Sequence, residues 1–173
     1  MNDINQFEFK LAKKNDIKPI FECVNEAYRV EKEHPIFGFK RCDRLADQSI
    51  VEDQLAVGTY LCCVDKKHTT LMGVIYYQII NHYAEVGPIA VFPRYQKKGL
   101  GTHLLVHVET ICKQKQCVEI NMNVVSTRLD LLDFYEKMGY LRQAETISPQ
   151  SIGLESDDLT KDVCVLRYRK CLQ

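Results

Sequence analysis

The sequence predicts a mixed α/β fold with a mainly antiparallel, twisted sheet. Apolar segments such as 70–80 and 83–91 follow one another with short polar linkers between them, which is typical of an antiparallel meander. Other segments, such as 99–115, carry apolar residues at helical spacing. The 173 residues are 46% hydrophobic, enough for the core of one domain. We therefore expect a single domain over residues 1–173, with about six to seven strands flanked by about four helices.

Each expected strand is a run of apolar or alternating residues bounded by polar or turn-forming ones. In chain order, the expected strands are 7–11, 60–65, 70–80, 83–91, 117–125, 140–147 and 162–171. The expected helices have an apolar face made by residues three or four positions apart. They are 15–28, 47–57, 99–115 and 127–138.

Capping residues mark the ends of these helices. Asn15 is suited to the N-cap of the first helix, and Pro19 falls in its first turn, where a missing N–H costs least. The segment Thr127–Asp130 fits a capping box at the start of the last helix. Gly58 and Gly139 follow the second and the last helix, as helix-terminating glycines do.

Charge and composition exclude several classes of function. Lys+Arg and Asp+Glu both number 23, so no bulk charge favours nucleic acid or an anionic membrane. The longest apolar run, 71–80, is too short to cross a bilayer, and we find no secretory signal pattern. The eight cysteines form no C-x-x-C pair, so we expect reduced, mostly buried thiols in a cytoplasmic protein. His68 and His82 lie in turns without a second ligand nearby, so no metal is predicted.

The strand over 83–91 contains an unusual pair, Gly87 followed by Pro88. Proline cannot donate a hydrogen bond to a neighbouring strand, and glycine weakens a strand interior. Either this strand lies at an edge, or it is a central strand that bulges or parts from a neighbour. We favour the second interpretation, which opens a gap within the sheet.

The same strand leads through a short basic turn into the glycine-marked start of a helix, over residues 83–102. The first N–H groups of a helix have no partner within the helix, and the helix dipole is positive there. Gly99 and Gly101 leave the backbone accessible, and Lys97 and Lys98 add positive charge. These features predict an anion site of pyrophosphate size. Neither the Walker pattern nor the dinucleotide pattern G-x-G-x-x-G is present.

Two motifs in this part of the chain resemble the GNAT superfamily of N-acetyltransferases. Gln96-x-x-Gly99-x-Gly101 is similar to its phosphate-binding turn, Q/R-x-x-G-x-G/A. The segment Phe134–Tyr140 is similar to its LYEKLGF segment and follows in the right order. The resemblance is most specific over residues 72–141. It implies acetyl-CoA as cofactor and a splayed sheet, with the pantetheine arm inserted like an added strand in the gap.

The resemblance also assigns cofactor contacts. The residues that it implies are Ile89, Ala90, Val91, Gln96, Lys97, Lys98, Gly99, Leu100, Gly101, Thr102 and Arg128. Arg128 departs from the family pattern, since many members carry asparagine seven residues before the tyrosine that corresponds to Tyr135. Arg128 either contacts a phosphate or amide of the cofactor or starts the helix at the surface.

Two residues are candidates for catalysis. A lysine-like amine has a pKa of about 10.4, so an acceptor must lose a proton to a base, to a water chain or through desolvation. The resemblance makes Glu85 the candidate base, usually through water; a glutamate that only faces solvent is the alternative. It makes Tyr135 the general acid toward the sulfur of acetyl-CoA, whereas the alternative is a core tyrosine. The resemblance further implies that the backbone N–H beside Val91 polarises the thioester carbonyl.

The sequence leaves the acetyl acceptor open. A small-molecule amine is the leading prediction, with Phe37, Phe39, Tyr76 and Tyr77 as the lining of a closed pocket. A protein N-terminus or lysine is the second, for which a wide acidic groove would be expected. A regulator that binds acyl-CoA without transfer is the third. None of the cysteines falls in the matched motifs, which favours direct transfer in a ternary complex. Such folds commonly dimerise through terminal strands, so a homodimer is one option.

Overall fold

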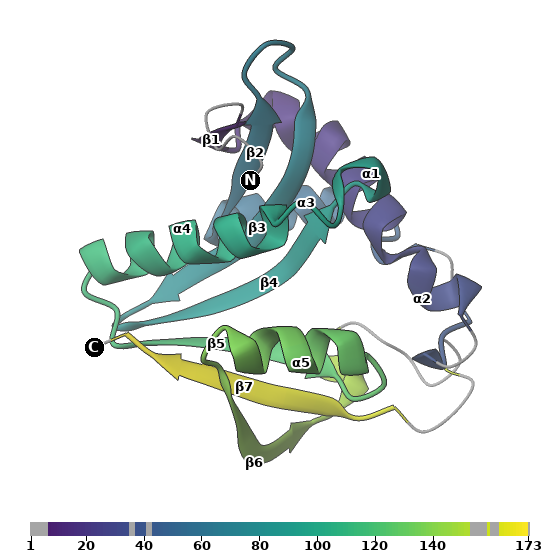
Figure 1. Cartoon of the computed structure of the whole chain (residues 1–173), viewed down its shortest axis with the longest axis vertical. Coiled ribbons are helices and arrows are strands. Elements are labelled where there is room, and N and C mark those ends of the chain that lie inside the picture. Colours follow the sequence, from purple (N-terminus) through teal and green to yellow (C-terminus); the bar gives the residue numbers. More distant parts are fainter. Residues whose placement is uncertain (1–6, 35–36, 41–42, 153–158, 160–162, 173) are drawn as a thin grey trace.

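The computed structural model describes residues 7–34, 37–40, 43–152, 159 and 163–172 (Figure 1). One seven-stranded sheet has the order β1-β2-β3-β4-β5-β7-β6. Its strands are β1 (Phe7–Leu11), β2 (Thr59–Asp65), β3 (Leu71–Ile80), β4 (Tyr83–Val91), β5 (Glu119–Val125), β6 (Leu141–Ile147) and β7 (Val165–Cys171). The helices are α1 (Ile17–Tyr28), α2 (Val30–Glu33), α3 (Ser49–Val57), α4 (Leu100–Gln114) and α5 (Leu129–Lys137).

The mixed α/β class and the mainly antiparallel sheet are confirmed. β4 and β5 run parallel, and all other neighbouring strands of this sheet are antiparallel. Every predicted strand is present, and only the single turn α2 was not predicted among the described helices. No helix of the described residues has both the length and the apolar character needed to cross a membrane.

Helices cover the two faces of the sheet and bury a core on each. α4 and α5 pack on one face, where Leu104 and Val108 of α4 meet Ile75 of β3. α1 and α3 pack on the other face, where Ile20 and Val51 are fully buried. Neighbouring residues of β3 alternate between these cores because side chains along a strand point to opposite faces.

The predicted parting of two central strands is confirmed. β4 pairs with β5 only from Tyr83 to Val86, opposite Glu119 to Met122. Beyond this point β4 continues beside β3 and β5 continues beside β7, so the two strands diverge (Figure 1). The divergence begins at Gly87, whose φ is 131°, and at Pro88, which has no N–H to donate.

Two predictions about helix starts are wrong. Asn15 does not cap α1, because it lies within the 3-10 turn Lys14–Asp16 that precedes the helix. The Asp16 carboxylate instead accepts hydrogen bonds from the Lys13 N–H and the Lys10 ammonium, each at 2.8 Å. The Asp16 side chain thus bonds to residues that precede α1, and the expected Asn15 cap does not form.

The capping box over Thr127–Asp130 is also absent, since no side chain caps α5. The Thr127 hydroxyl donates to the carbonyl of Phe37 at 2.9 Å, a contact 90 positions away in the chain. Asp130 accepts two hydrogen bonds from the Arg128 guanidinium. A contact distant in the sequence and a local Arg128–Asp130 ion pair therefore replace the capping box.

Gly58 ends α3 as predicted, but for a different reason. Its backbone is extended rather than left-handed, so the conformation does not require glycine. A Cβ atom at this position would lie 2.4 Å from the hydroxyl oxygen of Tyr76. Tyr76 is buried and packs against Tyr60, with ring centroids 5.2 Å apart. Close approach to this ring explains the glycine.

The thiols are as expected in the described residues. Five of the seven described free cysteines are buried, and Cys164 and Cys171 are exposed. Burial raises the pKa of the Cys63 thiol to about 11 and that of Cys112 to about 12. These thiols are therefore protonated and unreactive at neutral pH. Within the described ranges, no group of three or more His, Cys, Asp and Glu side chains could hold a metal ion.

Candidate active site

The turn between β4 and α4 exposes the start of the helix. Gly99 (φ 80°) and Lys97 (φ 59°) are both left-handed, which reverses the chain and begins α4 at Leu100. The side-chain amide of Gln96 donates to the carbonyl of Val91 at 2.9 Å and fastens the turn to the end of β4. No side chain of the described residues caps α4, so its first N–H groups point outward.

A pocket of about 440 Å³ lies over this turn. Nine of the eleven residues predicted to bind the cofactor line it; Ala90 and Lys98 do not. Ala90 is buried on the opposite face, where its carbonyl accepts a hydrogen bond from the Cys23 thiol at 3.8 Å. Lys98 is exposed, with its ammonium 5.7 Å from the centre of the Tyr95 ring. A Cβ atom at Gly101 would meet nothing within 4 Å, so the floor of the pocket is open there.

The backbone of β4 adds polar groups to this pocket. The Phe92 N–H donates to the Met72 carbonyl at 3.0 Å, on the side of β3. Successive residues of an antiparallel strand direct their backbone groups to alternate sides. Ile89 and Val91 therefore direct their backbone groups toward the gap, where β5 has left β4.

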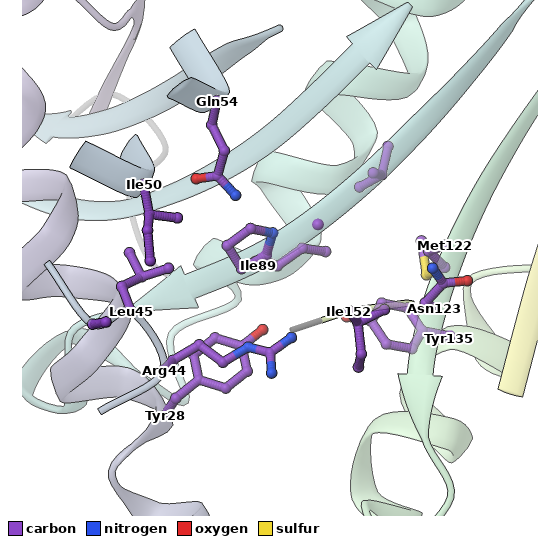
Figure 2. A pocket seen from close by; sticks show the side chains of 14 residues that line it. Tyr28, Arg44, Leu45, Ile50, Gln54, Ile89, Met122, Asn123, Tyr135 and Ile152 are labelled. Carbon is purple, nitrogen blue, oxygen red and sulfur yellow. The ribbon is translucent and has the colours of Figure 1, made fainter. Parts of the chain in front are cut away.

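A second pocket, of about 530 Å³, lies between α1, α3, β4 and β5. In Figure 2, Tyr28 and Arg44 enter it from one side, and Met122, Asn123 and Tyr135 from the other. Tyr28, Ile89 and Tyr135 line both pockets, so the two pockets meet at these residues. Ligands bound in both would reach the same tyrosines.

Tyr135 is held by the packing of α5 and is 7% exposed. Its ring makes edge contacts with Phe134 and Tyr140 at centroid distances of 5.2 and 6.2 Å. Burial raises the pKa of the Tyr135 phenol above its ordinary value of 10.0, so the hydroxyl keeps its proton at neutral pH. Among the described residues it makes no hydrogen bond, and it remains a donor for a ligand.

Arg128 lies at the start of α5 and lines the turn pocket. Its guanidinium donates to both Asp130 oxygens at 2.9 Å. The central carbon of the guanidinium lies 5.0 Å from the centre of the Phe37 ring. The hydrogen bonds from Arg128 hold the pKa of Asp130 below its usual range. Arg128 thus joins α5 to the segment before α3. It starts the helix from a buried position rather than at the surface, and its contact with a cofactor stays a prediction.

Glu85 lies on the face of β4 opposite α4, beside the larger pocket but outside its lining. Its carboxylate accepts hydrogen bonds from both terminal nitrogens of Arg167 on β7, one of them at 2.7 Å. Arg167 also donates to the amide oxygen of Asn123 at 3.0 Å. Of these three residues, only Asn123 lines the pocket.

The structure does not bring the four predicted acceptor residues together. Tyr76 is buried in the core under α1 and α3, and Tyr77 is buried in the core under α4. They are adjacent on β3, so they point to opposite faces and cannot share a pocket. Phe37 packs against Arg128, and Phe39 lines a small adjoining cavity of about 40 Å³.

The residues that sequence analysis missed come from elements far apart in the chain. Tyr28 ends the expected helix 15–28 and was given no role in the site, yet as the last residue of α1 it reaches both pockets. Asn123 had a usable signal, since Asn121 and Asn123 are polar residues at alternate positions of a central strand. Nothing local in the sequence pointed to Gln54 or Arg44.

A splayed sheet, a helix start beside the gap and two pockets that meet at Tyr28 and Tyr135 suit an enzyme that brings two substrates together. A model of the acetyltransferase (GNAT) family matches residues 20–140. The chain belongs to this family, and the protein is an N-acetyltransferase.

Solved structures with this fold include three acetyltransferases. The ribosomal-protein-S18-alanine N-acetyltransferase from Escherichia coli has 13% identity and a TM-score of 0.75, over 96% of this chain and 94% of that chain. The spermidine N-acetyltransferase from Vibrio cholerae, in complex with CoA and spermine, has 15% identity and a TM-score of 0.71, over 97% and 96%. A GNAT acetyltransferase from Staphylococcus aureus Mu50 has 18% identity and a TM-score of 0.68, over 96% and 99%. At these identities the likeness shows the fold alone.

Burial of Tyr135 predicts a difference in alkaline stability between the wild type and Tyr135→Phe. Because the folded-state pKa is raised, the contribution of the phenol is complete below pH 10 and is lost as the pH rises further, when the unfolded chain ionises. Tyr135→Phe has no phenol to ionise, so its stability does not fall for this reason. We expect the stability difference to move in its favour by about 1.4 kcal/mol per pH unit above pH 10.

Urea unfolding of both proteins between pH 8 and pH 11 measures this difference. The interval from pH 8 to pH 9 is the internal control, because there the difference should stay constant. If the stabilities of the wild type and Tyr135→Phe change in parallel up to pH 11, the Tyr135 phenol ionises as readily in the folded protein as in the unfolded chain. That result would contradict the effect expected from its burial.

Proposed function

We propose that the protein transfers an acetyl group from acetyl-CoA to the primary amine of a small molecule, directly and in a ternary complex. The observation that carries this proposal is the junction of two pockets at Tyr28, Ile89 and Tyr135. The larger pocket, of about 530 Å³, is in the size range of small-molecule sites. Both substrates can therefore meet without an acyl-enzyme.

The residues of the turn pocket fit acetyl-CoA, which supplies an activated acetyl thioester. The outward N–H groups of the Gln96–Thr102 turn and the positive end of α4 suit a pyrophosphate. Lys97 adds a positive charge, and Gly101 leaves room for close approach. The gap-facing backbone of Ile89 and Val91 suits an extended chain bearing amides, as a strand added to an edge would be bound.

Tyr135 stabilises the departing sulfur in this proposal. The reaction forms an N–C bond, breaks the C–S bond, takes one proton from the amine and returns one to the sulfur. A thiol has a pKa of about 8.5 and a phenol about 10, so complete transfer from the phenol is uphill. Burial increases this gap for Tyr135. A hydrogen bond from its hydroxyl to the sulfur is therefore its main contribution.

Two routes can remove the proton from the amine. Glu85, as the base, acts through a water, because it lies beside the larger pocket without lining it. Desolvation in the pocket also favours the neutral amine, and apolar lining residues such as Leu45, Ile50 and Met122 provide it. We propose the route through Glu85.

Solved structures of the same fold include a spermidine N-acetyltransferase and a ribosomal-protein-S18-alanine N-acetyltransferase. The fold therefore serves both small amines and amines carried by proteins. The dimensions of the larger pocket favour the small class for this protein. Peptide acceptors are the second candidate that an assay should include.

Calorimetric titration of acetyl-CoA tests the cofactor site. We expect micromolar binding by the wild type and about 100-fold weaker binding by Gly101→Glu, because the new carboxylate occupies the anion site. Val106→Glu is the matched control, since Val106 is 46% exposed on α4 and lies away from the turn. Absence of binding by the wild type would refute the cofactor assignment, and equal binding by both glutamate variants would refute the location.

Tyr135→Phe tests the proposed role of the hydroxyl in turnover. We expect kcat to fall about 100-fold while acetyl-CoA binds with unchanged affinity, because only the hydrogen bond to the sulfur is lost. Tyr77→Phe is the control: Tyr77 is buried in the core under α4 and lines neither pocket, so the loss of its hydroxyl should leave kcat unchanged. Product mass is the readout, since eight cysteines interfere with thiol reagents. Equal kcat would remove Tyr135 from the mechanism.

Glu85→Gln distinguishes the two routes of proton removal. We expect kcat about 100-fold lower at neutral pH, with the loss narrowing toward pH 10 as the free amine becomes abundant. Glu119→Gln is the control, because Glu119 pairs with Arg169 at 3.5 Å and lines neither pocket. A loss that is equal at every pH, or no loss, would favour desolvation instead.

A further inference from the structure

The orientation of the Asn123 side chain is fixed by its neighbour across the sheet. Asn123 on β5 lies directly opposite Arg167 on β7. The guanidinium of Arg167 donates to the amide oxygen of Asn123 at 3.0 Å. Because a guanidinium has no acceptor, the oxygen of the amide must face Arg167. The amide nitrogen is therefore directed away from Arg167.

Arg167 is itself held in place by Glu85. Both terminal nitrogens of the guanidinium donate to the Glu85 carboxylate, one of them at 2.7 Å, and the Arg167 side chain is 15% exposed. Such paired, charge-assisted hydrogen bonds fix the plane of the guanidinium. Strands β4, β7 and β5 each contribute one member, so the sheet sets the position of the Asn123 amide.

Asn121 provides an internal comparison on the same face of β5. Its oxygen also accepts a hydrogen bond from a β7 arginine, Arg169, at 3.2 Å. Its nitrogen donates to Glu119 at 3.1 Å, and the residue is 3% exposed and lines neither pocket. The nitrogen of Asn123 has no such acceptor among the described residues, and Asn123 lines the larger pocket beside Tyr135 (Figure 2).

The chemistry of an amide N–H limits what it can bind. It cannot take a proton from the reacting amine, and it cannot accept a hydrogen bond from an amine N–H. Its partner must be an acceptor atom, such as a carbonyl or carboxylate oxygen. The described lining of the larger pocket contains no Asp or Glu, so a second ammonium group of a polyamine would find no carboxylate there.

We propose that the amide nitrogen of Asn123 recognises a carbonyl or carboxylate oxygen next to the reacting amine. The acceptor is thus an amine of the amino-acid or amino-amide type, and neither a polyamine nor a plain alkylamine. Arg167 is the positioning residue for this contact. The inference rests on the proposed function, because it names the acceptor class of the same pocket.

Three amines of similar size test the recognition: alanine, alaninamide and isopropylamine. Isopropylamine carries a methyl group where the other two carry a carboxylate or a carboxamide. We expect Asn123→Ala to lower kcat/KM about 10- to 100-fold for alanine, alaninamide or both, mainly through KM, and less than about 2-fold for isopropylamine. The ratio of variant to wild type cancels the different pKa values of the amines. Asn121→Ala is the matched control and should affect all three equally.

Three kinetic outcomes overturn the proposal. An equal loss for all three amines would place Asn123 at the shared acetyl group, and no loss would remove it from the site. A wild-type preference for spermidine over alanine and alaninamide would also overturn the proposed class. Two other outcomes support the proposal. A fall in kcat/KM confined to alanine identifies a carboxylate as the recognised group, and a fall that includes alaninamide identifies a carbonyl oxygen.

Binding without turnover separates this proposal from the proposed function. The wild type and Asn123→Ala, each saturated with desulfo-CoA, are titrated calorimetrically with alanine and with alaninamide. Binding of either ligand that is about 10-fold weaker in the variant supports the role of Asn123, even if no amine is acetylated and the proposed transfer fails. Equal binding by both proteins overturns it, even if turnover is found.

Arg167→Met tests the positioning role with the same three amines. Without the donor, the Asn123 amide can rotate, and the preference for an oxygen-bearing amine over isopropylamine should fall about 10-fold. Arg167 also pairs with Glu85, but a change in the base affects all three amines alike and cancels in this ratio. Arg167→Lys keeps one donor and should restore part of the preference. An unchanged preference in Arg167→Met would show that Asn123 does not depend on Arg167.

Discussion

The separation of β4 from β5 at Gly87 and Pro88 is the constraint on which the site depends. The two strands share only four residue pairs before they diverge, so each loses a neighbour where a continuous sheet would have one. Unpaired backbone in a sheet centre is costly unless a ligand, water or side chain satisfies it. The same divergence leaves room for a pocket on either side, and the backbone directed into the gap becomes a binding surface.

A partly buried ion pair fixes the helix that carries Tyr135 across this gap. The Lys170 ammonium on β7 donates to both oxygens of Glu109 on α4 and to the carbonyl of Met138 after α5, each at 2.8 Å. Glu109 also accepts from the Tyr140 hydroxyl at 3.1 Å. Losing Lys170 would leave the Glu109 carboxylate, whose side chain is 12% exposed, without its counter-charge. The network joins α4, α5 and β7, and so it orients the tyrosine relative to the turn.

Much of the fold and the geometry of the turn pocket could be predicted because these features are local. The Gln96–Thr102 turn needs a strand end, left-handed positions and a helix start, all within one short segment. Other features depend on contacts distant in the chain. The Thr127 hydroxyl donates to the carbonyl of Phe37 instead of capping α5, and Tyr76 and Tyr77 are buried in two different cores. Periodicity shows which residues share a face, but it does not show what covers that face.

The two sides of the site differ in the kind of group that makes them. Eight of the fifteen residues that line the turn pocket come from the one segment 89–102, where exposed backbone groups contribute to the surface. The larger pocket is lined by residues of several separate elements, among them α1, α3, β4, β5 and α5. Low identity with acetyltransferases of the same fold is consistent with this division. Acceptor specificity therefore has to be inferred from individual contacts, such as the orientation of the Asn123 amide by Arg167.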